Sequence, residues 1–390
     1  MDVVRQEGFD SHNDLNKCGG ELGNWRNLTT FIVKSGFTGK SGSSSIDLGE
    51  TMKRLVWRGG DDLTLEYSSG SLPGPQRDEV LLKIRAVGIC GTDIHILKGA
   101  LPLAKPPMVL GHEVSGEIAA VGANVEHVRE GDRVTLDAVV GCGHCCLCKR
   151  DSVQFCTKGF EFGITRDGGC QEYLVVPKRN VYRIADTVSF EEAAILDMEV
   201  YNAVRKCGVE PTDSVLVLGA GPIGLIACQV ARILGAGHVT LSDVLSGRLD
   251  TARAIGMADA YLSGEERGEP AVTGSNGAEG YDIVIDCAGT SQSAKRALSI
   301  VRPGGRVLFY GVHEHPINDL DLNQIVLKDL VVLGAQSDRN GWEEVIDLVT
   351  SRTLDLRSLI THRFSLEEGR RAYELVGKRE ESVIKAVLVF

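Results

Sequence analysis

A cysteine-rich segment in the first half of the chain is the clearest candidate for metal chemistry. Four of its cysteines follow a tight spacing: Cys142, Cys145, Cys148 and Cys156. Four soft thiolates can surround zinc tetrahedrally and leave no position open for a substrate, so the spacing predicts a structural zinc site. Cys146 breaks the even spacing, and we interpret it as a free thiol. His144 is an imidazole in the same loop and is the other residue that could enter the ligand set.

A second candidate metal site combines a cysteine and a histidine from separate segments. Cys90 follows a predicted strand, and His112 lies further along in the run Gly111-His112-Glu113. A single histidine or cysteine is more often a packed side chain than a ligand. Together, however, a thiolate and an imidazole are the partners of an open zinc site. The pair therefore predicts a catalytic zinc in addition to the structural one.

A glycine-rich turn later in the chain has the features of a dinucleotide site. The apolar strand at 215–218 leads into the residues Gly219, Ala220, Gly221, Pro222, Ile223 and Gly224, where an apolar helix begins. Such a turn lets the backbone approach a pyrophosphate, and the helix N-terminus favours its negative charge. Asp243 ends the next strand, where a carboxylate accepts hydrogen bonds from the ribose of NAD and repels the phosphate of NADP. Arg248 argues against this preference for NAD, because a nearby arginine can accommodate the phosphate of NADP. In the alternative, Arg248 is only a surface helix residue.

These segments together resemble one known family. The run at 88–95 (GICGTDIH), the GHE run at 111–113, the four-cysteine loop, the glycine turn and the tail phrase at 359–364 (LITHRF) are similar to the zinc-dependent medium-chain dehydrogenases, the superfamily of alcohol, polyol and threonine dehydrogenases. The resemblance covers Met52 to Phe390. It implies a GroES-like, mostly β catalytic domain, a Rossmann domain with a doubly wound parallel sheet, and a cleft between them that holds zinc and a nicotinamide. Two zinc ions, one catalytic and one structural, and NAD are the cofactors expected.

The resemblance also assigns roles to single residues. Cys90 and His112 become catalytic zinc ligands, and Glu113 a near or alternate ligand. Thr92 and His95 become a relay that carries the proton of the alcohol towards solvent. The chemistry agrees, because zinc lowers the pKa of a bound alcohol and an imidazole titrates near neutral pH. Asp93 is expected to support the ligands from behind, or else to serve only as a turn or capping acid.

The third zinc ligand departs from the family pattern. The position that usually carries a ligand before the Rossmann domain falls on Ile195, which cannot bind zinc. A local shift of two residues would place Asp197 at the metal, and this is the ligand that we expect. In the alternative, Asp197 caps a helix and Glu113 alone completes the site; Glu199 is a third candidate.

The surrounding sequence indicates how these groups are positioned. Residues 1–51 are rich in Gly, Ser and Asn and are expected to form a mostly disordered extension. From 52 to 200, short strands and Gly/Pro-rich turns predict the β domain. From 201 to 335, strands alternate with helices and predict the α/β domain. The tail, 336–390, carries helix signals and a final strand that are expected to return to the first domain.

Composition limits the classes of function. A chain of 390 residues is long enough for two domains, and its formal net charge of −11 disfavours nucleic acid or an anionic membrane as a partner. The acidic balance also argues against a zinc-ribbon module that binds nucleic acid. No apolar run is long enough to span a bilayer. Metal-like cysteine spacing in a chain of this length points to a reducing compartment, and we expect a cytoplasmic protein.

The sequence indicates the type of reaction more narrowly than the class of substrate. The stretch at 162–169 resembles polyol, sugar and cyclitol dehydrogenases, which predicts oxidation of a secondary alcohol to a ketone with NAD. An L-threonine 3-dehydrogenase is the nearest alternative. A catalytically silent, nucleotide-binding relative is a further alternative, against which the intact set of Cys90, Thr92, His95 and His112 argues. The family resemblance also implies a homodimer or homotetramer.

Overall fold

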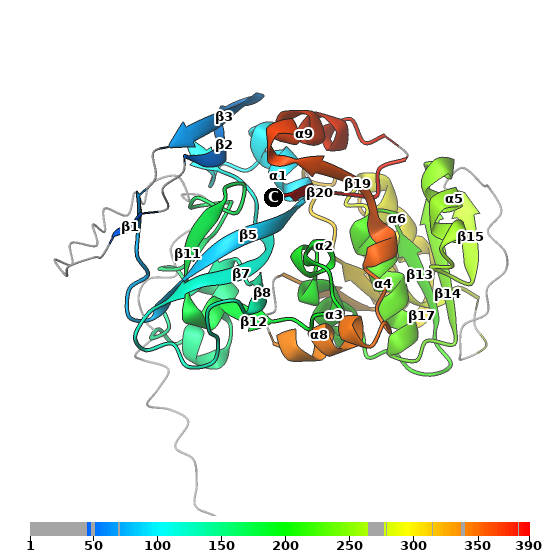
Figure 1. The fold of residues 1–390 in the computed structure, drawn as a ribbon. Helices are drawn as coiled ribbons and strands as arrows, with labels where there is room; N and C mark the ends of the chain where they lie inside the picture. The colour runs from blue at the N-terminus through cyan, green and yellow to red at the C-terminus, as the bar shows by residue number, and fades with distance from the viewer. Residues whose placement is uncertain are drawn as a thin grey trace, which may run out of the picture.

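The computed structural model describes residues 45–47, 51–68, 71–263, 277, 279–313, 315–336, 340–380 and 382–390. Most of the expected extension at 1–51 lies outside the described residues. The exceptions are Thr51 and strand β1 (Ser45–Asp47), which pairs antiparallel with β4 (Ser71–Pro73). The rest of the fold comprises a β-rich part and a parallel α/β part, which lie side by side in Figure 1.

The β-rich part is built on a seven-stranded sheet. Its strands run in the order β12-β8-β7-β5-β20-β19, and β11 also pairs with β5. Their bounds are β5 (Glu79–Ile89), β7 (Glu113–Val121), β8 (Arg133–Leu136), β11 (Tyr173–Pro177), β12 (Val181–Arg183), β19 (Ile360–Ser365) and β20 (Lys385–Val389). Strands β19 and β20 come from the tail of the chain, and β20 lies antiparallel to β5. The last residues of the sequence therefore complete the sheet that also carries Cys90 at the end of β5.

Smaller elements surround this sheet. A second sheet has the order β3-β2-β6, and β9 pairs with β10. The bounds are β2 (Met52–Gly59), β3 (Asp62–Ser68), β6 (Met108–Val109), β9 (Val139–Val140) and β10 (Phe160–Glu161). Helix α1 (Gly91–Leu97) follows β5 directly and packs against α9 (Gly369–Gly377). A continuous apolar core, which includes Leu82, Ile84, Val114 and Leu388, joins the strands of this part.

The α/β part is a six-stranded parallel sheet in the order β15-β14-β13-β16-β17-β18. The strands are β13 (Ser214–Leu218), β14 (His238–Asp243), β15 (Ala260–Ser263), β16 (Tyr281–Asp286), β17 (Val301–Phe309) and β18 (Val331–Gly334). All residues of β13 and β16 are buried, which is typical of central parallel strands covered on both faces. Helices α4 (Pro222–Ile233), α5 (Ser246–Ala254) and α6 (Ser291–Ile300) pack on this sheet. The predicted doubly wound architecture is thus confirmed.

Three helices join the two parts. They are α2 (Phe190–Ala194), α3 (Met198–Lys206) and α8 (Trp342–Thr350), and they lie in the lower middle of Figure 1. Helix α2 packs on β5, β7 and β8, whereas α3 packs on α4 and α8. The chain thus crosses from one sheet to the other through the short segment between α2 and α3, which contains Ile195 and Asp197.

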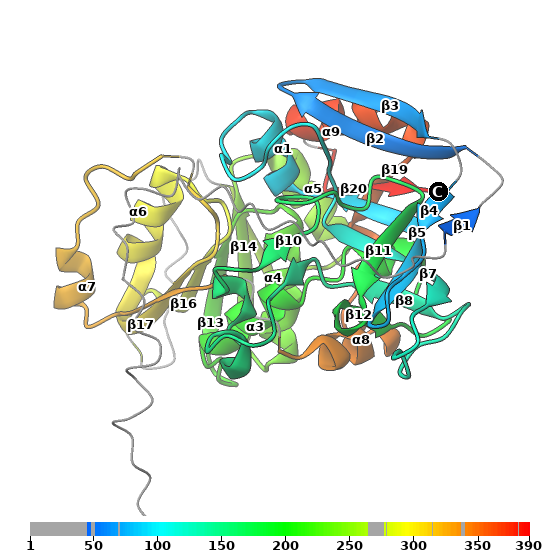
Figure 2. The ribbon, with the colours of Figure 1, turned by 90° about the vertical axis from the view of Figure 1, so that its left-hand side faces the viewer.

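One edge of the parallel sheet is exposed. Strand β18, at the edge of the sheet, and the short helix α7 (Asn323–Leu327) contain no buried residue, and α7 lies at the outer left of the molecule in Figure 2. Val326 and Leu327 are 75% and 85% exposed. No helix among the described residues is long and apolar enough to cross a membrane.

Candidate active site and zinc centres

Asp93 links the two segments that carry the proposed catalytic ligands. Its side chain is fully buried in the first turn of α1. One carboxylate oxygen accepts a hydrogen bond of 2.9 Å from the backbone N–H of Cys90, and the other lies 3.3 Å from Nδ1 of His112. The carboxylate therefore caps the helix and also lies beside the imidazole. The capping role that the sequence left as one alternative is observed, and the support of the metal ligands stays a prediction.

The ligand atoms of Cys90, His112 and Glu113 converge. A sulfur, a ring nitrogen and a carboxylate oxygen from these residues all lie within 4.8 Å of one another. A thiolate, an imidazole and a carboxylate are the donor types that zinc accepts, and three protein ligands leave the open position that catalysis requires. The donor set therefore fits a catalytic zinc ion.

The environment of His112 favours a positive charge. Burial lowers the pKa of this imidazole, but the charges of Asp93 and Cys90 raise it by more, so that the net pKa lies well above the ordinary value. Since a histidine must be neutral to bind zinc, uptake of the metal has to displace this proton. A pocket that attracts one positive charge in this way also suits a divalent cation.

Asp197 does not join this donor group. Its Oδ1 accepts a hydrogen bond of 3.1 Å from the backbone N–H of Val200 and caps α3. Burial raises the pKa of Asp197 to about 6, and the nearby carboxylate of Glu113 also raises it. The geometry therefore favours the alternative in which Glu113 is the third ligand, and the assignment of Asp197 to the metal stays a prediction. Glu199 is not one of the three residues whose donor atoms converge, although it interacts with other residues.

The proposed relay residues share one face of α1. Thr92 and His95 are three positions apart, a spacing that places side chains next to one another on a helix. The hydroxyl of Thr92 lies 3.6 Å from the sulfur of Cys90, and both relay residues are half-buried. Thr92 therefore lies next to the donor group, and the relay through Thr92 and His95 stays a prediction.

A glycine-rich segment fixes the backbone next to His112. The backbone N–H of Gly168 donates to Val109, and that of Gly169 donates to Gly111, both at 2.7 Å. A Cβ atom on Gly163 would lie 2.5 Å from the carbonyl oxygen of Gly111 and 2.8 Å from the nitrogen of His112. Residues 162–169, which the sequence suggested as a mark of the substrate, therefore pack against the backbone of Gly111 and His112, the proposed metal ligand.

Two charged or polar residues near the site were missed by the sequence reasoning. Lys385 in β20 is 6% exposed, and its ammonium group lies 2.6 Å from Glu113. A lysine inside the apolar run of a final strand is the signal that could have revealed it. Tyr310 follows β17 in the parallel sheet; burial raises its pKa well above the ordinary value, and the charges of Asp197 and Cys90 raise it further. Only the folded chain brings this tyrosine near enough to Asp197 and Cys90 for their charges to act on it.

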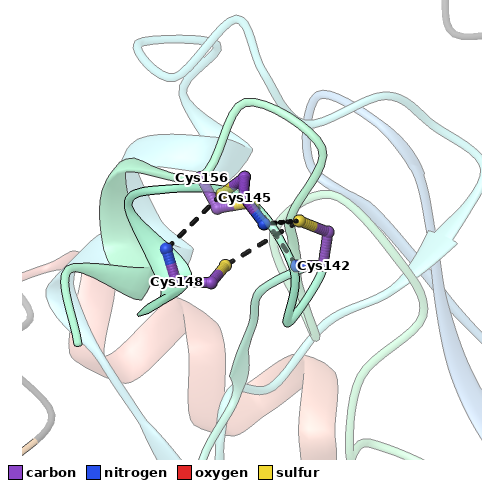
Figure 3. A group of neighbouring side chains, drawn as sticks. All are labelled: Cys142, Cys145, Cys148 and Cys156. Carbon is purple, nitrogen blue, oxygen red and sulfur yellow. Dashed lines mark hydrogen bonds between the residues drawn. The ribbon is translucent and has the colours of Figure 1, made fainter. Parts of the chain in front are cut away.

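The four cysteines of the predicted structural site also converge, as Figure 3 shows. Sulfur to sulfur distances are 3.9 Å for Cys142 and Cys148 and 3.7 Å for Cys145 and Cys156. Four thiolates at ~2.3 Å from a tetrahedral zinc ion would lie about 3.8 Å apart, so the loop fits the metal. Cys146 is outside the group, as expected for a free thiol.

Hydrogen bonds and burial shift the pKa values of the thiols in the cysteine loop. A hydrogen bond from the backbone of His144 lowers the pKa of Cys142 to about 6. Burial raises the pKa of Cys148 to about 12 in the same metal-free loop. The backbone N–H groups of Cys145 and Cys148 each lie 3.4 Å from the sulfur of the preceding cysteine in the group. The imidazole of His144 contacts the carbonyl oxygen of Cys142 and is not a member of the ligand group.

The glycine turn lies between β13 and α4. Gly219 has a φ of +107°, which favours glycine, and a Cβ atom on Gly224 would lie 1.8 Å from the carbonyl oxygen of Gly219. Pro222 occupies the first position of α4, where its missing N–H has no partner to lose. Gly221 caps the same helix, and Ile223 continues it, so that the N-terminal amides remain available to a pyrophosphate.

Asp243 ties this turn to the next strand. Its carboxylate accepts hydrogen bonds from the backbone N–H groups of Ala220 at 2.6 Å and Leu245 at 2.8 Å. Nη1 of Arg248 lies 4.0 Å from the position of a Cβ on Gly221, and its Nε is buried without a hydrogen-bond partner. Both residues therefore lie where the sequence predicted, beside the turn.

Two family models match this chain, one in each part of the fold. The family model described as alcohol dehydrogenase GroES-like domain matches residues 76–186, and that described as zinc-binding dehydrogenase matches residues 222–351. An L-threonine 3-dehydrogenase of Pseudoalteromonas translucida is 35% identical over 316 residues, which cover 78% of this chain and 91% of the relative.

Two solved structures show the same fold. A structure described as a short chain alcohol dehydrogenase from Escherichia coli, complexed with NADH, has a TM-score of 0.78 and 30% identity, covering 88% of this chain and all of that chain. A putative zinc-binding dehydrogenase from Sinorhizobium meliloti, bound to NADP, also has a TM-score of 0.78, with 29% identity, covering 87% of this chain and all of that chain.

A GroES-like β part, a Rossmann-type parallel sheet and two convergent donor groups define a two-domain, zinc-binding oxidoreductase. The chain belongs to the zinc-dependent medium-chain dehydrogenase superfamily. The predicted family, fold class and pair of cofactor types, zinc and a nicotinamide dinucleotide, are confirmed at this level.

Proposed function

We propose that the protein oxidises a secondary alcohol to a ketone and reduces NAD. The observation that carries this proposal is the convergence of Cys90, His112 and Glu113 within 4.8 Å. A site made of these three donors leaves one position of a tetrahedral zinc ion open for the oxygen of a substrate. The intact donor set also argues against a catalytically silent relative.

The residues around this group support each part of the reaction. Zinc, when bound, acts as a Lewis acid that lowers the pKa of the substrate hydroxyl. Asp93 keeps the imidazole of His112 oriented, Thr92 accepts the hydroxyl proton, and His95 passes it towards solvent. The glycine turn before α4 would hold the dinucleotide, whose nicotinamide would supply the acceptor for the hydride. Asp243 favours a free ribose hydroxyl and hence NAD, with Arg248 placed against the pyrophosphate side of the turn.

The substrate class divides into two candidates. The resemblance of residues 162–169 to polyol dehydrogenases motivated a polyol, cyclitol or sugar alcohol. Because this segment packs under His112, its sequence is explained by the scaffold and says little about the substrate. The relative that acts on L-threonine favours a hydroxy-amino acid as the second candidate. Both candidates carry a secondary hydroxyl, so the proposed chemistry is the same.

A substrate screen with defined metal content tests the proposal. Protein containing two zinc ions per chain is incubated with NAD or NADP and with L-threonine, polyols or inositols, and reduction of the nicotinamide is followed by absorbance. We expect turnover on at least one secondary alcohol, with NAD preferred. The matched control is Cys90→Ser, which should bind the dinucleotide but fail to turn over. Equal activity of the two proteins would contradict the proposed site.

Assembly and location belong to the same proposal. We expect a homodimer or homotetramer, and the exposed apolar edge made by β18 and α7 supports this expectation. None of the cysteines within the described residues forms a disulfide, which supports a reducing compartment such as the cytoplasm. Sedimentation of the purified protein and localisation of a tagged chain test these two expectations.

A further inference from the structure

We propose that Lys385 is a positioning residue that keeps Glu113 a weak, displaceable ligand of the catalytic metal. This inference rests on the proposed function, because it assumes that a metal ion occupies the group formed by Cys90, His112 and Glu113. It adds a regulator of that group from the last strand of the chain. Lys385 would act through the carboxylate and would touch neither the metal nor the substrate.

The strand register brings the relevant residues together. Glu113, at the start of β7, pairs with Gly88 of β5. On the other side of β5, Ala386 of β20 pairs with Ile89. Lys385 therefore lies one residue further along, next to the end of β5 that carries Cys90. Three neighbouring strands place one lysine beside the carboxylate of the donor group.

The contact between the two side chains is close and buried. The ammonium nitrogen of Lys385 lies 2.6 Å from each oxygen of Glu113. The lysine side chain is 7% exposed and that of Glu113 is 19% exposed. A charge-assisted contact of this length is stronger than a neutral hydrogen bond, and water does not screen it as it would at the surface.

The carboxylate also has a niche on the side of β5. A Cβ atom on Gly88 would lie 2.0 Å from Oε2 of Glu113 and 2.9 Å from Cγ2 of Ile195. The space left by the glycine is therefore filled by the carboxylate, and Ile195 closes the niche. Ile195 supplies an apolar wall that cannot bind a metal ion.

The charges around Lys385 bind it firmly to this place. The side chain of Lys385 is buried, and its ammonium nitrogen is in direct contact with the carboxylate of Glu113. A metal ion at the donor group has to share the carboxylate of Glu113 with a cation that is already there.

This sharing has a thermodynamic consequence. With Lys385 present, the negative charge of Glu113 is paired with a cation whether or not the metal is bound. Coordination of the metal by this carboxylate therefore contributes little free energy. Without the lysine, the metal-free protein holds a buried carboxylate that lacks a cation, which is unfavourable. The metal ion then becomes the only cation within reach of Glu113. Removal of the lysine charge should therefore strengthen metal binding and slow the exchange of the ligand.

The test compares Lys385→Met with Lys385→Arg in the full-length protein. Methionine keeps the length of the chain but removes the charge, whereas arginine keeps the charge. The cysteine loop retains its zinc, and the catalytic group is loaded with zinc or cobalt(II). Metal affinity is measured by competition with a chelator, and the coordination of cobalt(II) by its visible absorption. Both readouts are independent of turnover and of the identity of the substrate.

We expect Lys385→Met to bind zinc about tenfold or more tightly at the catalytic group and to change the cobalt(II) spectrum, while Lys385→Arg stays close to the parent protein. In the background of Glu113→Gln, Lys385→Met should have no further effect on affinity. If Lys385→Met folds only with metal, the rate at which a chelator removes zinc from the loaded protein provides the measurement instead, and it should be slower than in the parent protein. Unchanged or weaker metal binding in Lys385→Met, or an equal gain without Glu113, overturns the inference.

The design separates two kinds of failure. If the parent protein takes up no metal beyond that of the cysteine loop, the proposed function fails and the inference fails with it. If the parent protein binds the second metal and Lys385→Met binds it with the same affinity and spectrum, only the role of Lys385 is refuted. A structural role alone would lower the melting temperature of both lysine variants without changing the cobalt(II) spectrum.

Discussion

Substitution of Gly168 by alanine should disable the catalytic group without touching a ligand. A Cβ atom at this position would lie 2.2 Å from the carbonyl oxygen of Gly111 and 2.5 Å from Cα of Gly163. Ordinary van der Waals contact begins at 3.4 Å, so the backbone has to yield by about 1 Å. Both neighbours are backbone atoms, and Gly111 precedes His112. The ligand is therefore expected to move with it.

The size of the effect follows from this displacement. A misplacement of ~1 Å can reduce catalysis about 100-fold, and overpacking typically costs about 1–3 kcal/mol of stability. We expect Gly168→Ala to lose about 100-fold in kcat/KM and part of its catalytic zinc, with a modest fall in melting temperature. Zinc content, steady-state kinetics and calorimetry on the same preparation provide the measurements.

A matched control makes the result interpretable. Gly334→Ala introduces the same methyl group at a position where nothing lies within 4 Å, so it should leave zinc content and kcat/KM unchanged. The zinc of the cysteine loop should persist in both variants, because neither glycine contacts that loop. Full activity and two zinc ions in Gly168→Ala would refute the reasoning that residues 162–169 hold His112 in place.

Four further outcomes are expected. Cys145→Ser should lose the zinc of the cysteine loop and melt at a lower temperature, as metal analysis and calorimetry can show, because metal binding there contributes to folding. The metal-free loop should take up zinc more weakly as the pH falls through about 6 in a titration, since Cys142 then loses its thiolate. Asp243→Asn should narrow the ratio of kcat/KM for NAD over NADP about tenfold, and a parent enzyme that prefers NADP would contradict this role. Asp197→Asn, which keeps an oxygen for the cap of α3, should retain both zinc ions and near-normal kcat; loss of the catalytic zinc would identify Asp197 as a ligand after all.

The sequence was sufficient wherever function depends on short spacing. The glycine turn before α4 and the cysteine loop were predicted because their residues must be neighbours in the chain to act together. The expected strand at 215–218 is observed as β13, and the expected helix at 223–234 is observed as α4 (Pro222–Ile233). Local propensity and periodicity determine such elements, so a single sequence reveals them.

Contacts between strands that are distant in the chain could not be predicted from the sequence. The pairing of Lys385 with Glu113 depends on the register of β20 and β7 on β5, which no local pattern encodes. The third ligand shows the same limit. Asp197 and Glu113 both have suitable side chains, and only the fold shows that one caps a helix while the other faces Cys90.

Asp93 has a consequence for how the active site assembles during folding. Its two oxygens contact the first N–H of the segment that becomes α1 and the ring of His112, which lies in the loop before β7. The start of the helix and the orientation of the His112 imidazole therefore depend on a single buried carboxylate. We expect the two to form and melt as one cooperative unit, so that hydrogen exchange at the N–H of Cys90 should report directly on the integrity of the catalytic group.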